Sequence, residues 1–191
     1  MNEMIHQWLP IVAVVAVFAE RMREVFAKRD TVRGKTKETL TFNLFMLCGV
    51  LIVACGIAEN VVYSRRLWWV TFIPGAVMSV LSFTIRRSAI RALGKFWSLH
   101  VEMREGHQFV KSGPFAYARH PVYFSMILEL LGIGLILNAW MALAGVFLVF
   151  IPTLIARVRM EECALVEQFG DPYRDYMRTT PAIFPFRGGA G

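Results

Sequence analysis

The residues of this sequence that could carry out chemistry lie in two stretches far apart along the chain. Arg157 and Glu161 are four residues apart, so on a helix they would share one face. His120 and Tyr123 stand at the start of a long run with almost no charge. A guanidinium can hold an anion through charge-assisted hydrogen bonds, and an imidazole or a carboxylate can accept a proton. Arg157 and Glu161 could equally be an ion pair at a membrane boundary with no role in chemistry. The elements that position these residues determine which of the two interpretations applies.

Uncharged runs indicate that these elements are membrane-spanning helices. Two runs, of twenty and nineteen residues, extend over 39–58 and 67–85. At about 1.5 Å per residue each would reach roughly 30 Å, the thickness of a bilayer core. A shorter run over 4–19 predicts a further crossing. The alternative for that run, a cleaved signal peptide, lacks both the basic start and the small-residue cleavage site that such peptides have.

The remaining apolar stretch is too long for one crossing. From His120 to Ala156 the only charged side chain is that of Glu129. We therefore expect two crossings, over about 122–137 and 140–156, joined by a tight turn at Asn138. Antiparallel helices joined by a tight turn bring their outer ends together, so the sequence predicts that His120 and Glu161 meet, with Arg119, Tyr123, Arg157, Arg159 and Glu162 around them.

The distribution of charge predicts the orientation of these helices. Hydrophobic residues make up 56% of the chain and charged residues 18%, with a formal net charge of +7. The segments 20–38, 86–119 and the tail from Arg157 carry nineteen of the lysines and arginines, whereas the loop 59–66 carries two. This asymmetry predicts an N-terminus outside and both long loops and the tail in the cytoplasm. The composition disfavours a soluble enzyme, and the positive balance is explained by topology, so no nucleic-acid partner is expected.

The sequence thus predicts an all-α integral membrane protein with about five transmembrane helices. Residues 1–85 would hold the first three crossings, and residues 86–191 would form a core around the C-terminal helical hairpin. Within this core, 86–96 has apolar residues at helical spacing between basic ones, which predicts an interfacial amphipathic helix. Segment 98–118 would roof a polar pocket. The four histidines show no metal-ligand spacing and no cysteine pair has a zinc pattern, so no metal is expected.

Three separated motifs in this core resemble a known family. They are Gly113-Pro-Phe-x-Tyr-x-Arg-His-Pro-x-Tyr123, Arg157-x-x-x-Glu-Glu162 and Phe169-Gly-Asp-x-Tyr-x-x-Tyr176. In this order they are similar to the isoprenylcysteine carboxyl methyltransferases. The wider group includes phospholipid N-methyltransferases and other integral-membrane enzymes that use S-adenosyl-L-methionine. The likeness extends over roughly residues 85–186.

The resemblance implies roles for particular residues. Arg157 matches an arginine assigned to the substrate, and Glu161 matches a carboxylate that binds the cofactor. Phe115 occupies the usual tyrosine position, which would leave an apolar contact there without a hydroxyl. The cofactor-binding positions implied in this chain are His107, Gln108, Phe109, Val110, Phe115, His120, Pro121, Val122, Tyr123 and Glu161.

The function implied is methyl transfer from S-adenosyl-L-methionine to a lipophilic acceptor, with membrane lipid as the surroundings. Carboxyl O-methylation of a prenylcysteine-like substrate is the family's namesake reaction. A phenolic or quinone-like lipid or an aminophospholipid are alternatives. A phenol or an amine would need a base, for which Glu162 or His120 is available. The predicted catalytic residues are therefore Arg157, which would hold the acceptor, and Glu162.

Two classes of function compete with this expectation. A sterol-reductase-like enzyme that uses NADPH shares a similar C-terminal pattern, and a protein could keep the fold without activity. The small number of crossings favours a prokaryotic protein, which would lie in the inner membrane. The resemblance and the charge distribution imply an active site on the cytoplasmic side.

Glu129 lies within a predicted crossing, where an ionisable side chain is energetically costly and usually faces protein or water. Ser125 and Gly132 share its face. Glu129 could therefore line a lipid-side cavity as a substrate-binding residue, or it could make a structural hydrogen bond, for example against the fifth crossing.

Overall fold

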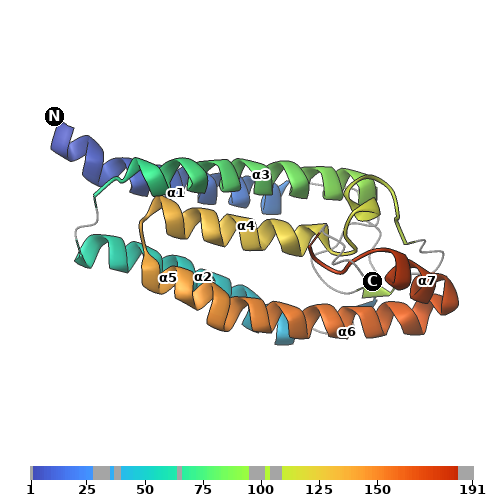
Figure 1. The fold of residues 1–191 in the computed structure, drawn as a ribbon. Helices are drawn as coiled ribbons and strands as arrows, with labels where there is room; N and C mark the ends of the chain where they lie inside the picture. The colour runs from blue at the N-terminus through green and yellow to red at the C-terminus, as the bar shows by residue number, and fades with distance from the viewer. Residues whose placement is uncertain are drawn as a thin grey trace, which may run out of the picture.

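The computed structural model describes residues 2–27, 35–36, 40–63, 66–94, 102–103 and 109–184. Within these ranges the chain is almost entirely helical (Figure 1). The long helices are α1 (Asn2–Phe26), α2 (Leu40–Val62), α3 (Trp69–Leu93), α4 (Pro121–Ile136) and α6 (Ile151–Phe169). The short elements are η2 (Gly113–Ala116), α5 (Trp140–Gly145), the π-helical turn η3 (Val146–Phe150), α7 (Asp171–Thr179), and an antiparallel pair of two-residue strands, β1 (Lys35–Thr36) and β2 (Glu102–Met103).

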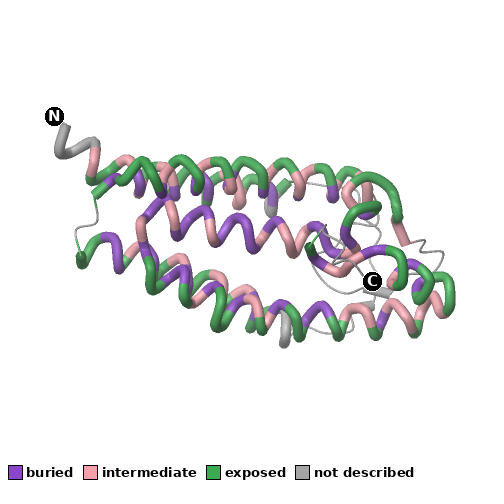
Figure 2. Tube along the Cα trace, in the orientation of Figure 1, coloured by how far each residue is buried: buried purple, intermediate pink, exposed green. Residues whose placement is uncertain are grey.

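The helices have the length and surface expected of a membrane protein. Among the described residues, three segments are long and apolar enough to cross a membrane: Asn43–Val62, Trp69–Leu93 and Trp140–Phe169. Large apolar side chains such as Val70, Val80 and Leu148 are exposed. Figure 2 shows exposed positions recurring along the long helices. Helices satisfy their own backbone hydrogen bonds, so such a surface is stable in lipid and costly in water. The prediction of an essentially helical fold with helices suited to a membrane is therefore confirmed.

Helix α4 is the central element of the bundle. In Figure 1 it lies between α1 and α3 on one side and α2, α5 and α6 on the other. It approaches α3 very closely: a Cβ built on Gly132 would lie 2.6 Å from Ser79 Oγ and 2.8 Å from the Gly75 carbonyl oxygen. Glycines at such crossings allow two backbones to touch, which replaces the hydrophobic driving force that lipid does not supply. This contact fixes α4 on α3.

The predicted helical hairpin with a turn at Asn138 is confirmed. Asn138 has a φ of +54°, a conformation that asparagine tolerates better than most residues. The end of α2 holds the turn: Asn60 Nδ2 donates to the Leu137 carbonyl at 2.8 Å. The buried Glu59 carboxylate accepts from the backbone N–H groups of Trp140 and Met141 at 3.0 and 2.9 Å. These are unpaired donors at the start of a helix, so Glu59 acts as a cap supplied from another helix.

The prediction of a separate interfacial helix starting at Arg86 is wrong. Helix α3 continues from Trp69 through Arg86 to Leu93 and ends at Gly94, which has a φ of +52°. Arg86 is buried, with 1% of its surface exposed, instead of lying among headgroups. The reason is that two carboxylates from other helices neutralise it, as described below. Residues 95–101 and 104–108, and with them part of the expected roof, lie outside the described residues.

Candidate active site

The two stretches singled out in the sequence meet at the end of the hairpin. Tyr123, in the first turn of α4, donates its hydroxyl to Glu161 Oε2 at 2.7 Å. Arg157 Nε donates to the same hydroxyl oxygen at 3.0 Å. His120 Nδ1 lies 4.0 Å from Glu161 Oε1, and its ring stacks on Tyr123 with 5.7 Å between centroids. The predicted meeting of His120 and Glu161 is confirmed.

Each of these side chains is aimed by its helix. Pro121 occupies the first turn of α4, where its fixed φ suits a helix start and its missing N–H costs nothing. It is buried and Val122 is half-buried. The Val122 carbonyl accepts from Ser125 Oγ at 2.6 Å. Arg157 and Glu161 are one turn apart on α6, so both can reach Tyr123. Arg157 has only 4% of its surface exposed, which strengthens its interaction with any anion nearby.

Glu162 is engaged by groups on either side of the start of α4. Its Oε1 accepts from Arg119 Nε at 2.8 Å and faces His120 Nε2 at 3.1 Å. Arg119 Nη2 lies 2.6 Å from the same oxygen. A carboxylate held by a guanidinium is a poor proton acceptor, because protonation would break that ion pair. These contacts favour a positioning role for Glu162 over the catalytic role expected for it, which stays a prediction.

The segment that follows α7 also takes part in the site, which sequence reasoning missed. The Arg119 and His120 backbone N–H groups donate to the Pro181 and Ala182 carbonyls at 2.9 and 2.8 Å. Arg119 Nη1 donates to the carbonyls of Met177, at 3.0 Å, and Thr180. The only local signal was the position of Arg119 beside His120. The tail therefore helps to hold His120 at the end of α4.

An aromatic cluster fixes the loop before α4. The Phe109 ring packs on the rings of Phe169, Tyr173 and Tyr176, with centroids 5.1, 5.4 and 5.7 Å away. The Tyr176 hydroxyl donates to the Phe115 carbonyl at 2.5 Å. Burial raises the pKa of the Tyr176 hydroxyl to about 12, so it stays a donor at neutral pH.

These contacts place several predicted cofactor positions. Phe109 and Val110 lead into η2, where Phe115 is buried and has its carbonyl oxygen bound by Tyr176. His107 and Gln108 lie outside the described residues. Of the predicted cofactor-binding residues, His120, Tyr123 and Glu161 thus lie in one cluster. Phe109, Val110 and Phe115 lie in the segment that precedes α4.

Glu129 belongs to a second polar cluster on another side of α4. Arg86 Nη1 donates to Glu129 Oε2, and Arg86 Nε donates to Glu24 Oε2 at 2.5 Å. Arg21 Nη1 lies 3.7 Å from Glu129 Oε2. The expectation that Glu129 packs against the fifth crossing is wrong, since these partners are on α1 and α3. The contacts favour the structural role that the sequence left open, and substrate binding by Glu129 stays a prediction.

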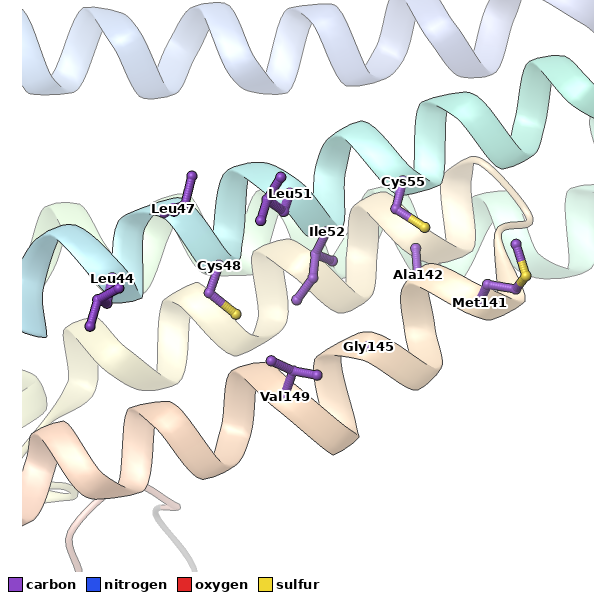
Figure 3. A pocket seen from close by; sticks show the side chains of 10 residues that line it. All are labelled: Leu44, Leu47, Cys48, Leu51, Ile52, Cys55, Met141, Ala142, Gly145 and Val149. Carbon is purple, nitrogen blue, oxygen red and sulfur yellow. The ribbon is translucent and has the colours of Figure 1, made fainter.

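An apolar groove of about 360 Å³ lies between α2 and the start of the last long helix (Figure 3). Its walls are Leu44, Leu47, Cys48, Leu51, Ile52, Cys55, Met141, Ala142, Gly145 and Val149. Phe45 and Phe150 are buried and do not line the groove. The Phe45 ring lies 4.9 Å from that of Phe150 and 5.9 Å from that of Tyr123, centroid to centroid. Among the described residues, no group of three or more His, Cys, Asp or Glu side chains could hold a metal ion.

Comparisons with known proteins agree with this arrangement. Cobalt-zinc-cadmium resistance protein CzcN of Cupriavidus metallidurans is 25% identical over 135 residues, which cover 70% of this chain and 61% of that protein. Protein-S-isoprenylcysteine O-methyltransferase B of Arabidopsis thaliana is 29% identical over 165 residues, covering 81% of this chain and 82% of the relative. The chain spans less than two thirds of the length of CzcN and of nickel-cobalt-cadmium resistance protein NccN of Alcaligenes xylosoxydans xylosoxydans, at 61% and 54%.

The fold is also that of a solved structure. The eukaryotic intramembrane Ras methyltransferase ICMT matches 94% of this chain with a TM-score of 0.62 and 20% sequence identity, and the match covers 62% of the solved chain. The model of the "Isoprenylcysteine carboxyl methyltransferase (ICMT) family" matches residues 75–167, which include α4, the hairpin and both polar motifs up to Glu162. The predicted resemblance to the isoprenylcysteine carboxyl methyltransferase family is therefore confirmed over residues 75–167.

Proposed function

We propose that this protein transfers a methyl group from S-adenosyl-L-methionine to a lipophilic acceptor. The observation that carries the proposal is the hydrogen-bonded series Arg157–Tyr123–Glu161 beside His120, at the end of a bundle whose outer surface is apolar. A polar cluster that can hold a charged head, at the end of helices that can lie in lipid, suits an amphiphilic substrate. The family match supports the same reaction class.

The residues at the site fit the proposed methyl donor. Glu161 is about a quarter exposed, at 26% of its side chain, and has His120 4.0 Å from Oε1. A carboxylate in this place would favour a cation and could accept hydrogen bonds from an ammonium or from ribose hydroxyls. S-adenosyl-L-methionine would supply an electrophilic methyl group on a sulfonium. The loop fixed by Phe109 and Tyr176 would border the donor on the side away from the bilayer.

The acceptor we propose is a prenylcysteine-like carboxylate. Such a group is ionised at neutral pH, so the protein would need to orient it and not to deprotonate it. The Arg157 guanidinium can hold a carboxylate by charge-assisted hydrogen bonds, and Tyr123 fixes the direction of that guanidinium. Orientation of two reactants in line is worth several kcal/mol of barrier, on the order of 7 kcal/mol or more in favourable cases.

Phenolic lipids and aminophospholipids are the alternative acceptors. Either would have to lose a proton. His120 would be the better candidate for the base, because the Glu162 carboxylate is paired with Arg119. The same variants test this alternative, since a neutral acceptor would lose far less from the removal of Arg157 than a carboxylate would.

In the membrane we propose five crossings: α1, α2, α3, α4 and the helix from Trp140. The N-terminus would be outside, and the site would face the cytoplasm of a prokaryotic inner membrane. Residues 1–85 would be the supporting helices and 86–191 the methyltransferase core. Helix α4 has sixteen residues and would reach only about 24 Å, which brings its polar start below the headgroups, where an amphiphile's head can enter.

Binding measurements test the donor. We expect S-adenosylhomocysteine to bind the detergent-solubilised protein in calorimetry and NADPH not to bind. Glu161→Gln should weaken that binding at least tenfold, and Arg174→Ala, at an exposed position of α7, should leave it unchanged. Binding of NADPH alone would favour the reductase alternative, and binding of neither would favour a protein without this activity.

Turnover measurements test the acceptor. With labelled donor and an N-acylated S-prenylcysteine, Arg157→Ala should abolish transfer while S-adenosylhomocysteine affinity is kept. If wild-type protein labels only phenols or aminophospholipids from a bacterial lipid extract, the prenylcysteine proposal fails although the methyltransferase proposal stands.

A further inference from the structure

The last long helix is fixed to the rest of the bundle at its beginning. Glu59 binds the backbone N–H groups of Trp140 and Met141. The side chain of Leu143 lies so close to Gly134 that a Cβ there would be 2.6 Å from Leu143 Cδ2. Ala142 likewise lies 3.3 Å from a Cβ built on Gly56. These contacts set the rotation of α5 about its own axis.

The same helix is fixed again some fifteen residues later. Arg157 and Glu161 both bind the Tyr123 hydroxyl, and Glu162 binds Arg119. Phe150 packs on Phe45. A helix held at two places must have the correct rotation at both. A straight α-helix has no freedom to adjust the angle between the two places.

The turn η3 lies between them. It is π-helical, and the Ile151 N–H donates to the Val146 carbonyl five residues earlier instead of four. Pro152 follows directly, so the Leu148 carbonyl has no N–H donor four residues on, and a wider turn avoids the clash of the proline ring with that carbonyl. Thr153 Oγ1 donates to the Val149 carbonyl at 2.8 Å. The local sequence therefore tolerates a turn that is rare elsewhere.

The spacing of buried residues shows what this turn does. Val146, Phe150, Leu154 and Val158 are all buried, at intervals of four. In a straight α-helix each interval of four adds about 40°, so Val158 would lie about 120° around the helix from Val146. A π turn accommodates about one extra residue, which removes about 100° of that drift. The buried side chains thus stay on one face.

We propose that η3 is the register element that aims Arg157 and Glu161 at Tyr123. If the same residues formed a straight α-helix, α6 would be rotated by about 100° relative to α5, and both side chains would point away from α4. The inference rests on the proposed function only for its binding readout, because the rotation itself can be measured without any ligand.

Deletion of Leu148 tests this directly. Leu148 lies within η3, is 76% exposed and contributes nothing to the polar cluster. The deletion removes the residue that the π turn accommodates. With that residue gone, a straight α-helix can join α5 to α6 with the same rotation at both ends, so the single deletion should keep the native register. The control Leu148→Ala keeps the length and should behave as wild type. A second variant deletes Leu148 and Ile155 together. No widened turn is then left to absorb the second loss, so Arg157 and Glu161 should be rotated by about 100°.

Two readouts apply to all variants. The first is the affinity for S-adenosylhomocysteine, which should be kept in the single deletion and should fall at least tenfold in the double deletion. The second is the distance between spin labels on native Cys163 of α6 and on Ser88→Cys of α3, with Cys48 and Cys55 replaced by alanine. Rotation of a side chain by about 100° at the radius of a helix surface moves it about 8 Å, so the distance should change in the double deletion and stay as in wild type in the single deletion.

The outcomes separate the two proposals. A lost affinity and a changed distance after the single deletion would overturn the register proposal, because Leu148 would then be an ordinary residue of a straight helix. Unchanged affinity and distance in the double deletion would overturn it as well. A wild-type protein that fails to bind S-adenosylhomocysteine would reject the proposed function. A distance that shifts in the double deletion and not in the single deletion would still support the register role of η3.

Discussion

Replacement of Glu129 by glutamine should destabilise the protein strongly, because it leaves a buried arginine under-compensated. The side chains of Arg86 and Glu129 are 2% and 11% exposed. The cluster of Arg21, Arg86, Glu24 and Glu129 is neutral as a whole, and Glu129→Gln gives it one net positive charge. Breaking a buried ion pair by removing one partner costs about 3–5 kcal/mol. Glutamine keeps the shape and can still accept a hydrogen bond, so we expect about 3 kcal/mol.

A loss of this size corresponds to a change of more than a hundredfold in the folding equilibrium, at about 1.4 kcal/mol per factor of ten. It would be measured by titrating sodium dodecyl sulfate into mixed micelles and following tryptophan fluorescence. Glu20→Gln is the matched control on α1. Glu20 pairs with Arg87, and these side chains are 24% and 41% exposed, so its loss should cost less than about 1 kcal/mol.

A double substitution completes this test. Arg86→Met with Glu129→Leu leaves Arg21 and Glu24 as a neutral remainder and should recover most of the loss, since apolar residues of similar volume replace buried ion pairs at little cost. Equal stability of Glu129→Gln and Glu20→Gln would refute the reasoning. If Glu129→Gln instead kept full stability and raised the KM for the acceptor, Glu129 would be the substrate-binding residue that the sequence predicted.

Three further substitutions have expected outcomes. Gly132→Ala should destabilise the protein by about 1–3 kcal/mol in the same titration, because the new methyl group would meet Ser79 and backbone of α3; no change would mean that α3 and α4 separate easily. Glu59→Ala should lower the free energy of unfolding by about 2 kcal/mol, because backbone donors of α5 lose their acceptor. A loss of less than about 0.5 kcal/mol would show that Glu59 does not stabilise the start of α5. Tyr123→Phe should lower kcat/KM for methyl transfer at least tenfold, since hydrogen bonds to charged groups contribute about 1.5–3 kcal/mol; retained activity would show that Arg157 needs no positioning by the phenol.

The sequence alone determined the helices and the meeting of the two polar stretches. Long uncharged runs specify helices because the bilayer leaves the backbone few other ways to satisfy its hydrogen bonds. The turn at Asn138 then makes α4 and the following helix antiparallel neighbours, so the positions of His120 and Glu161 at their ends follow from counting residues. The family model matches residues 75–167, a range that contains His120 and Glu161.

Only the tertiary structure decided which charges are buried. Arg86 was expected at the headgroups because its own neighbours alternate between apolar and basic residues. Its carboxylate partners, Glu24 and Glu129, are 62 and 43 residues away and on different helices, so no local pattern announces them. The same holds for the tail carbonyls that bind the backbone of Arg119 and His120.

The π turn shows the same division within one helix. The sequence places Pro152 and a four-residue repeat of apolar side chains there, and these are compatible with either a straight or a widened turn. What selects the widened turn is that Glu59 fixes the helix at one end and Tyr123 fixes it at the other. Contacts between residues distant in the sequence set the angle between those ends, and local propensity carries no information about them.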